Sequence, residues 1–134
     1  MLIFDLSLRR VKNRNLTYSY FVMKETEVKS LEAFEFVKSE NRAVLFYFST
    51  LSCSVGEVLE PKVKRMIQRD FSKIEFVWID MNAVPDVAAS NNVFVEPTIL
   101  LFIDGKEYLR KSRNIHLTDL QQTIRRIYDL AFED

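Results

Sequence analysis

The sequence predicts a single α/β domain in which a central, mainly parallel mixed sheet carries helices on both faces and ends in an antiparallel C-terminal hairpin. Three observations indicate this class. Beyond the first segment, stretches with a helical apolar period alternate with short apolar runs of strand length. The run RAVLFYFS is almost continuously apolar, as expected of a central strand covered on both faces. Asp104-Gly105 separates two strand-like runs, which is a strong hairpin signal.

The first half of this domain is predicted from Ser30 onward. Ser30 is placed to cap a helix whose apolar face holds Leu31, Phe34 and Val37. The buried strand over RAVLFYFS follows, and a second helix fits from about Ser54 to Phe71. Pro61 lies inside this helix and is expected to kink it or to mark a local break.

The second half continues the alternation. KIEFVWID, residues 73–80, is the next strand candidate, and Pro85 opens a short helix that ends near residues 91–92. TILLFI and KEYLRK form the hairpin, and the last helix is predicted to begin at Thr118 with Gln121 placed for a capping box. The aromatic residues within the predicted strands are expected in the core: Phe46, Phe48, Phe76, Trp78 and Phe102.

Composition limits the classes of function. The chain has 134 residues and is 48% hydrophobic, which suits one domain with a substantial core. Its 19 basic and 19 acidic residues give a formal net charge of zero, so no general attraction to nucleic acid or anionic lipid is expected. We expect a soluble protein, because no apolar run approaches the ~20 residues of a membrane span. The single cysteine excludes an internal disulfide, and a reducing, cytoplasmic location is the simplest expectation.

Residues 1–25 are predicted to be an N-terminal extension, and residues 26–134 the folded domain. The segment MLIFDLSLRR is apolar before it is basic and is interrupted by Asp5, the reverse of a secretory signal. Four basic residues stand against Asp5 alone in residues 1–23, so this part is basic and the remainder is acidic. Two interpretations stay open: an appended strand or arm, and a basic contact surface.

Cys53 is the candidate catalytic residue. It lies between the end of the predicted buried strand and the start of a helix, where backbone N–H groups and the helix dipole stabilise a thiolate. A buried, inert cysteine is the structural alternative. A second feature is NVFVEPTILLF, in which Pro97 precedes an apolar strand, as suits a residue that cannot donate a ladder hydrogen bond. Composition alone favours an ordinary trans bond before Pro97 over a cis bond.

Together these stretches resemble the thioredoxin family over roughly residues 26–132. The resemblance rests on VLFYFSTLSCSVGEVLEP, VEPTILLF and DGKEYLRK, which occur in the family's order. It implies a thioredoxin-like domain with a cis Pro97 beside Cys53, and with Val95 and Glu96 offering backbone groups to an extended substrate. The substrate-binding set that it implies is Ser52, Ser54, Val55, Gly56, Val95, Glu96 and Pro97.

The departures from the family bear on activity. The family carries Cys-x-x-Cys, in which the second thiol resolves the mixed disulfide, whereas this chain has Gly56 at that place. Tyr47 stands where the family has a buried acid, and Ser52 where it has a tryptophan. Glu96 and Glu57 are expected to oppose thiolate formation, although a solvent-exposed Glu96 would have little influence. A weakly activated thiol is therefore expected.

Other chemistry lacks support in the sequence. His116 is the single histidine and is expected at the surface or near a helix cap rather than paired with Cys53. One cysteine and one histidine do not form a tetrahedral metal site, and no glycine-rich phosphate loop is present, so no metal and no cofactor are expected. Tyr18, Tyr20 and Phe21 next to the basic segment do not establish a nucleic-acid surface.

Three functional hypotheses remain. The first is a monothiol redox protein, in which Cys53 forms a mixed disulfide with a protein or low-molecular-weight thiol and an external thiol resolves it. The second is a non-catalytic thioredoxin-fold module that binds proteins. The third is that Gly56 replaced a working cysteine in an otherwise active family. A monomer is the expected state, although Cys53 or the N-terminal segment could support a dimer.

Overall fold

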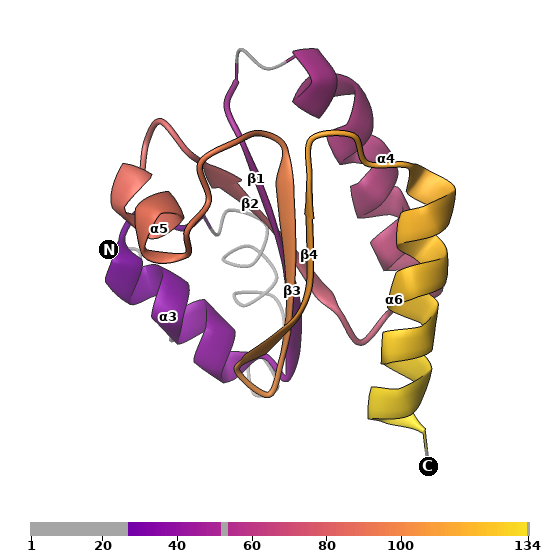
Figure 1. Ribbon diagram of the computed structural model, residues 1–134. Helices are drawn as coiled ribbons and strands as arrows, with labels where there is room; N and C mark the ends of the chain where they lie inside the picture. The colour runs from indigo at the N-terminus through magenta and orange to yellow at the C-terminus, as the bar shows by residue number, and fades with distance from the viewer. Residues whose placement is uncertain (1–26, 52–53, 134) are drawn as a thin grey trace, which may run out of the picture.

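The computed structural model describes residues 27–51 and 54–133. The predicted N-terminal extension, Ser52 and Cys53 lie outside these residues. The elements, shown in Figure 1, are α3 (Leu31–Glu40), β1 (Ala43–Ser49), α4 (Ser54–Asp70), β2 (Glu75–Asp80), α5 (Pro85–Ser90), β3 (Thr98–Ile103), β4 (Lys106–Ser112) and α6 (Leu117–Phe132). The predicted alternation of helices and strands and the terminal hairpin are confirmed.

The four strands form one mixed sheet in the order β2-β1-β3-β4. β1 pairs in parallel with β2 and antiparallel with β3, and β3 pairs antiparallel with β4. The sheet that the described strands form is therefore mixed, as predicted, but only one of its three strand pairs is parallel, so the expectation that it is mostly parallel is wrong for these strands.

The short α5 explains this difference. Six residues rise only about 9 Å, too little to carry the chain back along a strand of ~17–20 Å. The chain consequently enters β3 from the end of the sheet where β1 and β2 finish, and Thr98 pairs with Phe48. This reversal brings Pro97, directly before β3, to the carboxyl end of β1.

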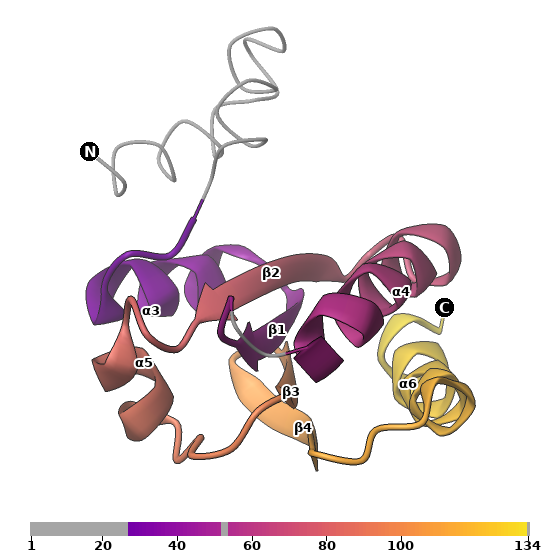
Figure 2. The same cartoon turned by 90° about the horizontal axis from the view of Figure 1, so that it is seen from above.

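Helices cover both faces of the sheet, as Figure 2 shows from above. α3 and α5 pack on one face, where Phe34 lies 4.3 Å from Phe46 between ring centroids. α4 and α6 pack on the other face, against Leu45 and Tyr47. Because successive β1 side chains enter opposite cores, all seven residues of β1 are buried, which explains its continuous apolar sequence.

β2 is at an edge of the sheet that the described strands form, and this changes one expectation about the core. Phe76 and Trp78 are only partly buried, whereas Phe46, Phe48 and Phe102 are buried as predicted. The indole N–H of Trp78 donates a 2.8 Å hydrogen bond to Ser49 Oγ at the end of β1. The polar edge of the indole ring is thereby satisfied at the boundary of the core.

The first residue of α3 is set by a neighbouring side chain, whereas the first residue of α6 is set by tertiary packing. Ser30 caps α3 as predicted, with its Oγ accepting a 3.0 Å hydrogen bond from the Ala33 N–H. α6 begins at Leu117, with His116 as the N-cap and no side-chain cap bond, so the expected start at Thr118 with a capping box is wrong. Ile115 and Leu117 pack against the core below α4 and α6, and we attribute the earlier start to this packing.

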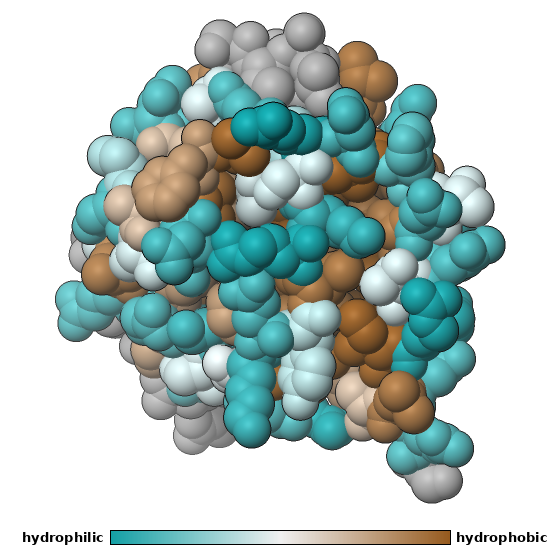
Figure 3. Space-filling view, in the orientation of Figure 1, coloured by the Kyte–Doolittle hydropathy of each residue, from teal (hydrophilic) through white to brown (hydrophobic). Residues whose placement is uncertain are grey.

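α4 continues past Pro61 to Asp70 as a single helix, so the expected break does not divide it. Hydrophobic surface remains visible between β4 and α6, bordered by hydrophilic side chains (Figure 3). Within the described residues, no helix is both long and apolar enough to cross a membrane.

Candidate functional site at the carboxyl end of β1

The candidate site is at the end of the sheet where β1 finishes and α4 begins. Ser54, Val55 and Gly56 form the first turn of α4, whose N-terminal end lies at the top of Figure 1. Cys53 directly precedes this turn, and Cys53 and Ser52 lie outside the described residues. The loop before β3 and the loop after β4 reach the same end of the molecule, so three segments distant in sequence meet there.

The loop before β3 carries a cis peptide bond between Glu96 and Pro97, the geometry that the family resemblance implied. Pro97 is buried, while Val95 and Glu96 are partly exposed. Thr98 Oγ1 donates a 2.7 Å hydrogen bond to the Val95 carbonyl, so that carbonyl already has a donor within the protein. Among the hydrogen bonds between described residues, none uses the backbone N–H or C=O of Glu96.

The Glu96 side chain joins this loop to the segment that leads to Cys53. Its carboxylate accepts hydrogen bonds from the Thr50 backbone N–H at 2.7 Å and from Thr50 Oγ1 at 3.2 Å. The alternative of a freely exposed Glu96 is therefore wrong. A carboxylate held by two donors stabilises the geometry of both segments, because hydrogen bonds to a charged acceptor are stronger than neutral ones. The predicted effect of Glu96 on the thiolate stays a prediction, because Cys53 lies outside the described residues.

The loop after β4 is attached to the other side of Pro97. The Arg113 N–H donates a 2.9 Å hydrogen bond to the Pro97 carbonyl, and the hydroxyls of Thr98 and Ser112 share another at 3.0 Å. Arg113 is exposed and has φ of 64°, in the left-handed region that favours glycine. No local sequence signal marks this position, because arginine is not a residue that usually adopts such a conformation.

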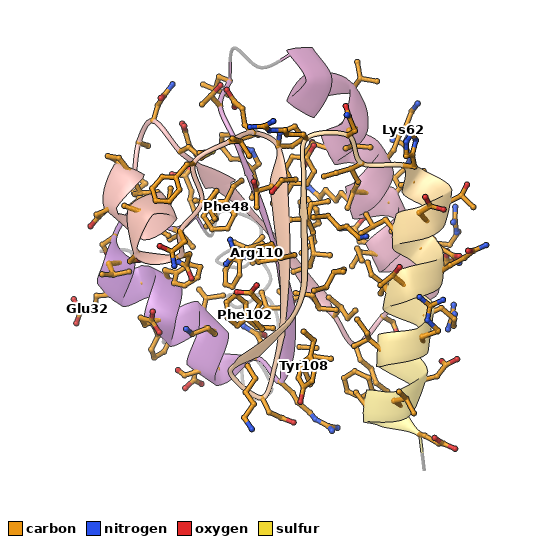
Figure 4. The ribbon with its side chains drawn as sticks, viewed as in Figure 1. Glu32, Phe48, Lys62, Phe102, Tyr108 and Arg110 are labelled. Carbon is orange, nitrogen blue, oxygen red and sulfur yellow. The ribbon has the colours of Figure 1, made fainter. Side chains whose placement is uncertain are left out.

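Arg110 contacts the chain between α5 and Pro97. Its guanidinium donates to the carbonyls of Asn91 and Asn92 and to the Glu107 carboxylate, which raises the pKa of Arg110. Figure 4 shows Arg110 extending from β4 toward the α5 side. Asn92 has φ of 57°, so this contact holds the turn that leaves α5. The sequence alone does not identify Arg110, Thr50 or Arg113 as supports of the site.

An open groove of about 760 Å³ lies between α4 and the loop that enters α6. Its lining residues are Val58, Leu59, Lys62, Arg113, Asn114, Ile115 and His116. Figure 4 shows Lys62 on α4 beside the N-terminal end of α6. His116 is exposed and is the N-cap of α6, which confirms the expected cap-region histidine.

Large apolar side chains are exposed on both segments that the Glu96–Thr50 contact joins. Leu51 is 72% exposed next to Thr50, and Phe94 is 73% exposed two residues before Glu96. Val58 on α4 is 62% exposed. Apolar side chains gathered around a loop cluster are typical of surfaces that contact other proteins.

Tyr47, at the position of the family's buried acid, is fully buried with its ring 6.1 Å from that of Phe76. This position therefore packs as part of the core. Within residues 27–51 and 54–133, no cluster of three or more His, Cys, Asp or Glu side chains could hold a metal ion.

Comparison with known proteins agrees with this architecture. The family model described as Thioredoxin matches residues 24–126 of the chain. The chain belongs to the thioredoxin family. The thioredoxin-like protein YdfQ of Bacillus subtilis is 35% identical to it over 109 residues, covering 81% of this chain and 96% of that protein. Thioredoxin H2 of Arabidopsis thaliana is 34% identical over 77 residues, covering 58% of this chain and 57% of that protein.

Solved thioredoxin structures are similar as well. The thioredoxin of Fasciola hepatica superposes with a TM-score of 0.67 at 27% identity, covering 73% of this chain and 94% of that chain. The thioredoxin fold therefore accounts for most of the described residues. A thioredoxin-family assignment implies redox function in general, and the particular site chemistry follows from the residues of this chain.

Proposed function

We propose that this thioredoxin-family protein is a monothiol thiol–disulfide exchange protein whose nucleophile is Cys53. The observation that carries the proposal is the pair of contacts that hold the Pro97 loop. Glu96 binds Thr50, three residues before Cys53, and the Pro97 carbonyl accepts from Arg113. A peptide-binding loop is thus fixed on both sides at the sheet end where Cys53 precedes α4, although Gly56 replaces the resolving cysteine.

The helix start supports the role of Cys53. α4 is 17 residues long, and the backbone N–H groups and positive dipole end at the start of a helix favour a thiolate directly before it. The backbone groups of Glu96, which no hydrogen bond between described residues uses, support the binding of an extended substrate segment by strand addition. Residues around Cys53, from Ser52 to Gly56, would then contact the substrate together with Val95, Glu96 and Pro97.

The exchange requires an external thiol to complete it. The Cys53 thiolate attacks one sulfur of a substrate disulfide, so that a Cys53–substrate disulfide forms and the other substrate sulfur leaves as a thiolate. A low-molecular-weight thiolate then attacks Cys53 Sγ, so that a disulfide between Cys53 and the external thiol forms and the substrate leaves as its second thiolate. A second external thiolate attacks the external sulfur of this disulfide. Cys53 is regenerated and the external thiols leave as their disulfide.

The proposal also covers the compartment, the substrates, the oligomeric state and the domain bounds. A reducing compartment such as the cytosol supplies the low-molecular-weight thiol that the cycle consumes. The substrates are protein disulfides or mixed disulfides with small thiols, and the chain acts as a monomer. The folded domain is taken to extend over residues 26–134, with residues 1–25 as an extension.

Alkylation of Cys53 as a function of pH tests the proposal, because no other thiol contributes. We expect an apparent pKa below the ~8.5 of a free cysteine, together with reduction of a glutathionylated peptide that requires both Cys53 and added glutathione. Cys53→Ser is the control for both measurements. An inaccessible thiol, or a pKa at or above the free value with no exchange, overturns the proposal in favour of a non-catalytic protein-interaction module.

A further inference from the structure

The groove beside the Pro97 loop differs in charge from two other open grooves formed by described residues. Among the described residues that line it, the charged side chains are Lys62 and Arg113, His116 is a further lining residue, and none is a carboxylate. The groove near the hairpin turn is lined by Glu35 and Asp104 together with its cations. The groove near the C-terminus is lined by Asp129 and Glu133 together with Lys73. In a chain with zero net charge, this groove is therefore a local cationic surface.

The two cations are not neutralised by described neighbours. Within the parts of the chain that the structure describes, neither Lys62 nor Arg113 forms an ion pair with an acidic side chain. The carboxylate of Glu96, on the adjoining loop, is held by Thr50. The start of α6 adds the positive end of a helix dipole, which Asp119 in the first turn partly offsets. The groove therefore keeps a positive potential available to a ligand.

Part of the groove lining is apolar. Val58 and Leu59 lie on the α4 side, and Ile115 lies on the opposite wall. Val58 is 62% exposed, so an incoming side chain can remove its surface from water. A ligand that matches both features carries an apolar side chain next to one or more carboxylates.

The groove adjoins the exchange site through the backbone. Arg113 is both a lining residue and the donor to the Pro97 carbonyl. Val58 is on the first turns of α4, five positions after Cys53. A peptide that occupies the groove is consequently adjacent to the loop at which a substrate disulfide would be presented.

We propose that this groove selects an acidic segment of the partner protein, in which Asp or Glu flanks an apolar residue. The inference rests on the proposed function, because it assigns the class of protein from which the exchanging disulfide comes. Lys62 and Arg113 bind the carboxylates, and Val58, Leu59 and Ile115 bind the apolar side chain. Neither cation takes part in the exchange of sulfur.

Fluorescence anisotropy with three labelled, cysteine-free peptides tests the assignment on the full chain. The peptides share a central leucine flanked by Glu, by Gln or by Lys. We expect the Glu peptide to bind most tightly and the Lys peptide most weakly, with about a three- to fivefold loss of affinity for each cation removed. The preference should fall at 1 M salt, where the screening length is only ~3 Å.

Matched variants assign the preference to the groove. Lys62→Glu and Arg113→Glu should each abolish or reverse the preference for the Glu peptide, and Arg113→Gly provides a variant compatible with the positive φ. Lys64→Glu is the control, since Lys64 is exposed on the same helix but lies about 200° around it from Lys62. Equal binding of the three peptides, no binding of any, or an equal effect of Lys64→Glu overturns the inference.

The same peptides separate this inference from the proposed exchange. With a cysteine added and activated as a mixed disulfide, the Glu peptide should react fastest with Cys53. If Cys53 exchanges with all three peptides at one rate and none binds preferentially, the groove assignment fails while the exchange proposal stands. If the Glu peptide binds selectively but Cys53 does not exchange, the exchange proposal fails and the groove assignment stands.

Discussion

Arg113 offers a direct measurement of how the loop after β4 is held. Its φ of 64° places a non-glycine residue in the left-handed region, which disfavours such a residue by about 1–2 kcal/mol. Glycine does not carry this conformational penalty, but its greater freedom in the unfolded chain offsets about 0.4–1 kcal/mol of the gain in stability. Arg113→Gly should therefore raise the free energy of unfolding by about 0.5–1 kcal/mol, because the N–H donor to the Pro97 carbonyl is kept.

Arg113→Ala is the matched control, because it removes the same charge but keeps a Cβ atom in the left-handed conformation. Urea unfolding of both variants should show Arg113→Gly as the more stable by about 0.5–1 kcal/mol, equivalent to roughly 2–4 °C in Tm for a domain of this size. If the two variants have equal stability, or if Arg113→Ala is the more stable, the argument from backbone conformation is refuted.

Three further predictions concern the supports of the site and its missing thiol. Glu96→Ala should lower the free energy of unfolding by about 1–2 kcal/mol, because the Thr50 N–H loses a charged acceptor. Glu96→Gln keeps an oxygen and should lower this free energy less, so equal urea midpoints for the two variants would contradict the prediction. Arg110→Ala should lower the free energy of unfolding by about 1–2 kcal/mol, because the hydrogen bonds to two carbonyls are lost. Lys111→Ala, at the neighbouring exposed position, should change this free energy little, and similar decreases in both variants would show that the Arg110 contacts contribute nothing. Gly56→Cys should allow an internal disulfide with Cys53, and the variant should reduce a disulfide peptide in a single turnover without glutathione. A thiol titration that finds both thiols free after mild oxidation would exclude the internal disulfide.

The elements that the sequence predicted correctly are those set by short-range physics. The β1 run, the Ser30 cap and the Asp104-Gly105 turn depend on neighbouring residues, and each is present in the structure. The start of α6 was predicted one residue late. The expected capping box does not form, and we attribute the observed start to the packing of Ile115 and Leu117 against the core.

The candidate site was predictable in part. Residues in the family motif around Cys53 and Pro97 could be identified, and the cis bond before Pro97 has the expected geometry. The partner of Glu96 could not be identified, because Thr50 is 46 residues away and the contact exists only when the loop before β3 closes on the end of β1. The cationic groove combines residues of α4 with residues 113–116, and neither stretch is unusually basic alone.

The sequence by itself determined the order of the elements, the buried central strand, the absence of a second thiol and the resemblance to thioredoxins. These properties follow from periodicity, turn chemistry and residue identity, which act over a few positions. Only the tertiary structure decided that β3 runs against β1, that Glu96 binds Thr50, and that Arg113 adopts a positive φ beside Pro97. Each of these depends on closing the chain between segments far apart, and the free energy that selects them comes from the packed core rather than from local preference.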